Sequence, residues 1–140
     1  MRTIKFRGKR CDNGEWVYGY YARLKNEFKE WHCIMTEKDA SENYIKDCNG
    51  YNMLYTPVNQ NTVGQFTGLL DKNGKEIYEG DILKAGDMGL LEVRFVRGVF
   101  AFLWNGNLDD EFPTGSPTHE WADVIGNIHD NPDLLKGGEL

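Results

Sequence analysis

Histidine and cysteine are candidates for chemistry in this chain, because the side chains of both bind transition metals. His32 and Cys33 are adjacent, and Cys11 and Cys48 are the other thiols. A structural zinc site normally shows two close ligand pairs, such as Cys-x-x-Cys. Neighbouring residues of a strand project to opposite faces, and no second pair follows. We therefore interpret the cysteines as buried or incidental thiols and expect neither a metal nor a cofactor.

Carboxylates that could act as general acids or bases occur as Asp109-Asp110-Glu111 and around Glu79 and Asp81. Catalytic carboxylates need burial or a close partner that shifts their pKa. Three acids within a polar segment are typical of a solvated run, and an aspartate after glycine, as at Asp81, is typical of a turn. These acids therefore do not predict hydrolysis.

Two histidines stand beside acids, in His119-Glu120 and His129-Asp130. The first pair does not continue as His-Glu-x-x-His, because position 123 is an aspartate. The chain contains neither Gly-x-Ser-x-Gly nor a phosphate-binding glycine loop. We expect no catalytic residue and predict that the protein is not an enzyme. An enzyme whose site assembles from scattered residues is the lowest-ranked alternative.

Cations and aromatic rings alternate with other residues near the N-terminus, which predicts that each set occupies one face of a strand. The candidate nucleic-acid surface consists of Lys5, Arg7, Lys9, Trp16, Tyr18 and Tyr20. If the two faces coincide, cations beside rings could hold phosphates and stack bases. Alternatively, the aromatic side chains form core while the basic face is solvated or pairs with acids.

Charge is distributed unevenly around a net value of −6. The first ten residues hold five basic residues and no acid, whereas the other 130 hold 11 basic and 22 acidic residues, a balance of −11. An acidic body repels the phosphate backbone and weakens any general affinity for nucleic acid. The basic end could still act as a local patch.

Period-two alternation and turn residues indicate the strands that carry these groups. Residues 3–9 alternate, Asn13-Gly14 suits a tight turn, and residues 15–24 return, so residues 1–24 predict a β-hairpin. A second hairpin is predicted from residues 91–96 and 99–104 around Arg97-Gly98. Shorter strands are expected at 31–35, 53–58, 62–70, 76–78, 82–84 and 124–128, and turns at 71–75 and 79–81.

Three segments predict something other than a strand. Thr36, with Asp39 three residues later, resembles a helix start, and a loop with one helical turn is equally compatible with this segment. Residues 105–120 are polar and rich in glycine and proline, which predicts an exposed loop. Residues 131–137 predict a helical turn in which Asn131 is the cap and Pro132 takes the first helical position.

Composition favours a mainly β protein, because 16 glycines stand against four prolines and aromatic residues make up 13% of the 140 residues. We expect one domain, 1–140, with an N-terminal hairpin unit and irregular insert over 1–60 and a C-terminal β-unit over 61–140. No apolar run approaches the ~20 residues of a membrane span. The basic start is not followed by an apolar stretch, so we expect a cytoplasmic protein with reduced thiols.

Three stretches together resemble the YopX family of phage and prophage proteins. They are Ile4–Gly8 with Gly14–Gly19, then Val63–Leu83, then Val124–Pro132. The resemblance implies an all-β fold with an SH3-like barrel element, in residues 61–140, and a phage or prophage setting in a bacterial cell. It carries no established activity and no catalytic residues to this chain.

The function that these observations favour is a non-catalytic protein-interaction or self-assembling module. Short β-units leave strand edges that a symmetric partner can cover, and Tyr and Trp are common interface anchors. We expect a homo-oligomer or another protein partner, without a membrane or a small-molecule substrate. The alternative is an accessory nucleic-acid-binding protein that uses the basic N-terminal strand and the adjacent aromatic residues.

Overall fold

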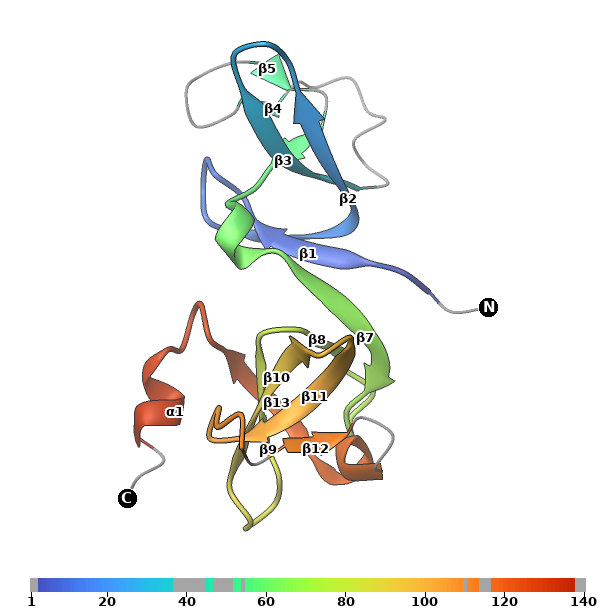
Figure 1. Cartoon of the computed structure of the whole chain (residues 1–140), viewed down its shortest axis with the longest axis vertical. Helices are drawn as coiled ribbons and strands as arrows, with labels where there is room; N and C mark the ends of the chain where they lie inside the picture. The colour runs from blue at the N-terminus through green and yellow to red at the C-terminus, as the bar shows by residue number, and fades with distance from the viewer. Residues whose placement is uncertain are drawn as a thin grey trace. The chain divides into compact units, whose positions relative to one another are not determined.

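Short antiparallel strands joined by tight turns make up most of the chain in the computed structural model (Figure 1). The structure describes residues 3–36, 45–46, 52–53, 55–109, 111–113 and 117–137. The predicted all-β class is confirmed. The chain divides into two compact units, Met1–Gln65 and Phe66–Leu140. No helix in the described ranges is both long and apolar enough to cross a membrane.

The first unit is an antiparallel sheet built outward from the predicted N-terminal hairpin. Its elements are β1 (Phe6–Lys9), β2 (Trp16–Lys25), β3 (Glu30–Met35), β4 (Ile45–Lys46), β5 (Asn52–Met53), β6 (Thr56–Pro57), the 3₁₀ turn η2 (Gln60–Thr62) and the start of β7 (Gly64–Leu70). The hydrogen-bonded order is β6-β3-β2-β1-β7, and β4 and β5 form a separate pair. Gly14 has φ of 73°, so the expected Asn-Gly turn between β1 and β2 is confirmed.

Strand β2 changes partners at Gly19. Phe6 pairs with Gly19 on the β1 side, and the next residue, Tyr20, already pairs with Met35 of β3. A Cβ atom at Gly19 would lie 2.1 Å from the carbonyl oxygen of Met35. Because no side chain fits at that distance, the change of partner requires glycine at this position.

The segment between β3 and β7 differs in part from the sequence interpretation. The predicted strand over 31–35 is confirmed as β3. In place of one strand over 53–58, the chain forms β5 and β6, followed by a bridge between Arg10 and Val58. The predicted helical turn that starts at Thr36 continues into residues outside the described ranges.

The second unit consists of a five-stranded antiparallel sheet and a two-stranded hairpin that precedes it in the chain. Its elements are the remainder of β7, then β8 (Glu76–Tyr78), β9 (Asp81–Lys84), β10 (Leu90–Val96), β11 (Val99–Trp104), β12 (Glu111–Pro113), the 3₁₀ turn η3 (Pro117–Trp121), β13 (Asp123–Asn127) and α1 (Asp133–Gly137). The order is β12-β11-β10-β9-β13, and β8 pairs with β7. Among the described residues no pairing joins β12 to β13, so the SH3-like barrel stays a prediction.

A single apolar cluster fills the second unit. Its fully buried members are Ile77, Leu83, Ala85, Leu91, Val93, Phe102 and Ala122. They come from β8, β9, β10 and β11, from Ala85 directly after β9 and from Ala122 directly before β13, so this core holds the long strands of the unit together. The predicted hairpin is confirmed, because Val96 pairs with Val99 around Arg97 and Gly98 at φ of 49° and 82°.

The expected exposed loop over residues 105–120 is confirmed at 105–109, which form mostly exposed turns, but it was wrong at 111–113 and 117–121. Phe112 pairs with Phe102 and Pro113 with Ala101, so β12 extends the sheet at its edge. Proline is tolerated in an edge strand because one side of that strand needs no N–H donor for the ladder. The Pro and Gly content that favoured a loop is therefore compatible with a short edge strand and the η3 turn.

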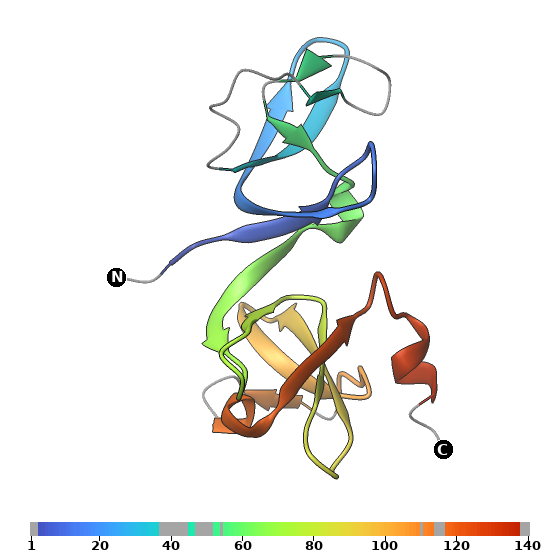
Figure 2. The same cartoon turned by 180° about the vertical axis from the view of Figure 1, so that it is seen from behind.

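The predicted C-terminal helical turn is present as α1, next to β13 (Figure 2). It begins at Asp133, and the side-chain oxygen of Asn131 accepts a hydrogen bond from the backbone N–H of Asn127 at 3.2 Å. The Asn131 side chain thus bonds the end of β13, while its backbone carbonyl accepts the N–H of Leu134 at 3.2 Å, so its role as the helix cap stays a prediction. Gly126 makes room for the Asn131 side chain, since a Cβ there would lie 2.4 Å from the side-chain oxygen.

Candidate interaction surfaces

Four of the six predicted site residues (Arg7, Lys9, Trp16 and Tyr18) lie on one face of the β1–β2 hairpin, and we name the whole set the ladder surface (Lys5, Arg7, Lys9, Trp16, Tyr18 and Tyr20). Arg7 pairs with Tyr18 and Lys9 pairs with Trp16 in the antiparallel register. Directly opposed residues share a face of the sheet, so the cation face and the aromatic face coincide. Lys5 precedes β1 by one residue, and Tyr20 lies in the part of β2 that pairs with β3.

Trp16 lies between two cations. The Arg7 guanidinium carbon is 4.5 Å from the Trp16 ring centroid, and the Lys9 ammonium nitrogen is 5.6 Å from it. Both distances are within the range of a cation–π interaction. Only 6% of Arg7 is exposed, so this guanidinium is built into the unit and orients Trp16. Lys5 and Lys9 are half-buried.

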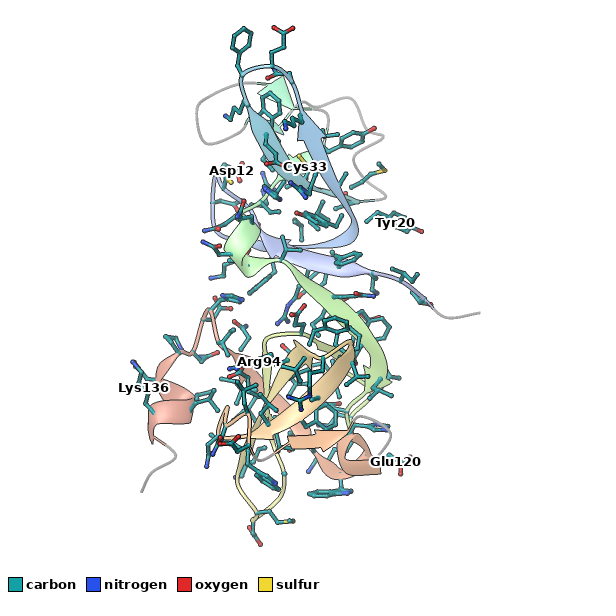
Figure 3. The ribbon with its side chains drawn as sticks, in the orientation of Figure 1. Asp12, Tyr20, Cys33, Arg94, Glu120 and Lys136 are labelled. Carbon is teal, nitrogen blue, oxygen red and sulfur yellow. The ribbon has the colours of Figure 1, made fainter. Side chains whose placement is uncertain are left out.

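The two tyrosines of the ladder surface are open to solvent. The exposed fractions are 46% for Tyr18 and 67% for Tyr20. The Tyr20 side chain points away from the ribbon of the first unit (Figure 3). Tyr21, the next residue, lies on the other face, where its ring stacks on His32 and its hydroxyl hydrogen-bonds His32 Nδ1. Burial raises the pKa of the Tyr21 hydroxyl.

Acidic residues at the turn end of the hairpin reduce its positive charge. Arg10 and Asp12 form an ion pair at 2.7 Å, and the side-chain hydrogen bond from Arg10 holds the pKa of Asp12 below its ordinary value. Glu15 is exposed beside the turn. Lys5 and Lys9 are therefore the cations of the ladder surface whose charge is best placed to act on a partner.

A second surface, which the sequence interpretation missed, lies at the end of the β10–β11 hairpin. We name it the hairpin-tip patch (Phe95, Val99 and Phe100). Half of Phe95 and 56% of Val99 are exposed, and the rings of Phe95 and Phe100 pack edge to face at 5.1 Å. The sequence did contain a signal for this patch. These apolar residues lie beside the Arg97-Gly98 turn, where the hairpin extends past the residues that form the core.

The candidate metal ligands do not assemble into a site among the residues that can be placed. Cys33 is buried, Cys11 is half-buried and both are thiols, while Cys48 lies outside the described residues. His32 is bonded to Tyr21. No three histidine, cysteine or acidic side chains within the described ranges are grouped closely enough to hold a metal ion.

Where the structure describes the acids and histidines considered for catalysis, they either bond the backbone or are exposed. Asp81 is buried and accepts the backbone N–H of Tyr78 at 2.8 Å, which confirms it as a turn residue. His119 Nδ1 contacts the carbonyl oxygen of Leu70 at 3.1 Å, and the adjacent Glu120 is exposed. Asp109 is exposed, Asp110 lies outside the described residues, and of Glu111 only the backbone is described.

Polar residues of the third sequence stretch organise the turn after β13. Asn127 accepts the backbone N–H groups of His129 and Asp130 at 3.0 and 2.8 Å, and its amide nitrogen donates to the Asp130 carboxylate at 3.1 Å. The Asn-Ile-His-Asp-Asn segment therefore builds a turn, and the backbone of His129 belongs to that turn.

The fold and its surfaces define a mainly β protein with two antiparallel units, an aromatic–cationic face on one and an apolar hairpin end on the other. The sequence model of the family described as YopX protein matches residues 5–136. The chain therefore belongs to the YopX family.

Two solved structures resemble the whole chain. Protein EF1440 from Enterococcus faecalis is 22% identical over 96% of this chain and 99% of that chain, with a TM-score of 0.50. Protein yopX from Bacillus subtilis is 21% identical over 96% of this chain and 97% of that chain, with a TM-score of 0.52. At this identity the likeness shows a shared fold. Among curated proteins, none matches the chain.

Proposed function

We propose that this YopX-family protein is a non-catalytic interaction module that assembles with copies of itself through the hairpin-tip patch. In this proposal the protein acts in the bacterial cytoplasm as a phage or prophage product. Its second unit is an SH3-like barrel element that presents the β10–β11 hairpin to the partner.

One observation carries the proposal: large apolar side chains are exposed at the end of a well-packed hairpin, Phe95 on one face and Val99 on the other. Phe95 and Val99 are about half exposed, although Val93, two residues further into β10, and Phe102, three residues further into β11, are fully buried. The strand pairing fixes the position of the tip, so little conformational entropy is lost when a partner covers it. Burying two such side chains removes apolar surface from water and favours association.

Light scattering after size-exclusion chromatography tests the proposal with Phe95→Ser/Val99→Ser. We expect the unsubstituted chain to exceed its monomer mass of 16.1 kDa as the concentration rises through the micromolar range. The double variant should elute as a monomer, because its hairpin keeps the register but loses the apolar anchors.

Phe28→Ser is the matched control, because Phe28 is 90% exposed in the β2–β3 turn of the first unit. This variant should associate like the unsubstituted chain. A chain that remains strictly monomeric at every concentration contradicts self-assembly. Equal loss of association in the control and the tip variant contradicts the role of the hairpin-tip patch.

A further inference from the structure

We infer that the ladder surface binds single-stranded nucleic acid, with unpaired bases stacking on Tyr18 and Tyr20 and phosphates approaching Lys5 and Lys9. This activity is separate from self-assembly. It uses a different surface, on the unit that does not contain the hairpin-tip patch.

The rows of the ladder surface repeat at a fixed interval. Tyr18 and Tyr20 are two residues apart in β2, as are Trp16 and Tyr18. Residues two apart in a strand lie about 6.6 Å from each other on the same face. The face therefore offers successive rings, and the first two, Trp16 and Tyr18, lie opposite Lys9 and Arg7. Proteins that bind single strands combine these two elements, a basic track and a series of stacking rings.

The six residues of the ladder surface differ in exposure, and we infer a different role for each group from that difference. Tyr18 and Tyr20 are open to solvent, so the faces of their rings can receive bases. Trp16 is half-buried and held between Arg7 and Lys9, so it supports the surface from one end. Arg7 positions Trp16 and is too deeply buried to reach a phosphate.

Charge favours a polyanion as the occupant of this surface. Residues 1–65 contain ten basic and eight acidic residues, whereas residues 66–140 contain six basic and fourteen acidic residues. The first unit thus carries +2 and the second −8. The aromatic rings also select among polyanions. A ring can stack on an unpaired base, whereas a duplex keeps its bases stacked on one another.

Fluorescence anisotropy with labelled oligo-dT and oligo-U of about 15 nucleotides, and a duplex of matched length, tests the inference. Binding should be measured between about 50 and 200 mM salt, where counterion release makes phosphate contacts visible. We expect both single strands to bind at least about tenfold more tightly than the duplex, because only they expose base faces. The ratio of oligo-dT to oligo-U affinity assigns the preference between DNA and RNA.

Two variants separate stacking from charge. Tyr18→Ser/Tyr20→Ser should weaken single-strand binding at least about tenfold with an unchanged salt slope, since each lost stack removes a salt-independent contribution. Lys5→Gln/Lys9→Gln should reduce the slope of log K against log salt by about 1.4, the value for two phosphate contacts on a single strand. Lys25→Gln is the control, because Lys25 is exposed at the far end of β2 and should leave both quantities unchanged.

Several outcomes overturn the inference. They are absence of binding by the unsubstituted chain at the lowest salt, duplex binding as tight as single-strand binding, and variants that bind like the Lys25 control. Loss of self-association in the tyrosine variant, without any nucleic-acid affinity in the unsubstituted chain, identifies the ladder surface as a protein contact and also overturns the inference. All variants keep the hairpin-tip patch, so failure here leaves self-assembly through that patch standing.

Discussion

At the scale of single residues, Asp71 holds together parts of the second unit that are distant in sequence. Its carboxylate accepts the backbone N–H groups of Asn73 and Lys75 in the β7–β8 turn at 2.8 and 2.9 Å. It also accepts the N–H of Val124 in β13 at 2.9 Å. One buried side chain therefore fixes a turn and attaches it to an edge strand of the neighbouring sheet.

We predict that Asp71→Asn lowers the free energy of unfolding of the second unit by about 1–3 kcal/mol. The amide keeps one acceptor oxygen but turns an NH₂ group toward a backbone donor, and an unpaired buried donor costs about this much. Urea unfolding at neutral pH measures the loss. Asp87→Asn, an exposed aspartate in the β9–β10 turn, is the control and should change stability little. Equal stability of the two variants contradicts the anchoring role.

The stability that Asp71 supplies should depend on pH in a defined direction. Burial alone raises the pKa of Asp71, but the hydrogen bonds from Val124, Lys75 and Asn73 and the charge of Lys75 outweigh it, so the folded pKa lies below the ordinary value. The carboxylate therefore contributes fully above the unfolded pKa, about 3.9. Its contribution is lost as the pH falls through the folded pKa.

Unfolding of the unsubstituted chain and Asp71→Asn across pH 7 to pH 3 checks this dependence. The stability difference should be constant near neutrality and should shrink only at the acidic end of that range, about 3–4. A difference that shrinks between neutrality and about pH 5 contradicts a depressed pKa at Asp71.

At the scale of elements, the position where β2 changes partners determines which side chains the ladder surface presents. Residues before Gly19 pair with β1, and residues after it pair with β3. Tyr18 and Tyr20 flank this point, so the close approach of the Met35 carbonyl oxygen to Gly19 places both tyrosines at the bend of the strand.

We predict that Gly19→Ala destabilises the first unit by about 3 kcal/mol, because the added methyl group would force the Met35 carbonyl to move. Gly14→Ala is the matched control: φ is 73° there, but a Cβ would meet no atom within 4 Å. Its left-handed strain should cost about 1 kcal/mol. Thermal unfolding compares the two variants, and a smaller cost at Gly19 than at Gly14 refutes the close-packing explanation.

Local patterns were sufficient to predict the two long hairpins. Alternation around Asn13-Gly14 and Arg97-Gly98 determines both the strands and their register, because neighbouring segments pair. The alternation predicted one face for Lys5, Arg7 and Lys9 and one face for the three aromatic residues, but it left open whether the two faces coincide. It could not predict that Arg7 is buried against Trp16, since burial depends on segments packed from elsewhere in the unit.

Elements that depend on distant partners were not predictable from local sequence. Strand β12 exists because β11 offers an edge, although residues 111–113 include a proline. The side chain of Asn131 bonds the backbone of Asn127, four residues earlier in the chain, a contact that its residue type does not predict. The hairpin-tip patch was missed because an apolar residue in a strand predicts burial, and only the position where the core ends reveals Phe95 as exposed.

At the scale of the whole molecule, the two units differ in charge and in the type of surface they present. The first unit is slightly basic and carries the ladder surface, whereas the second is strongly acidic and carries the hairpin-tip patch. The proposed activities therefore depend on different residues and different forces. Association through the tip should strengthen or persist at high salt, because it is apolar, while single-strand binding should weaken with salt.

Sedimentation velocity with a labelled single strand tests this separation most directly, since one run reports both the mass of the protein and the binding of the strand. The account predicts that Phe95→Ser/Val99→Ser sediments as a monomer that still carries the strand. It predicts that Tyr18→Ser/Tyr20→Ser assembles like the unsubstituted chain without carrying the strand. If either variant loses both properties while remaining folded, or if neither variant loses its own, the assignment of two activities to two surfaces is contradicted.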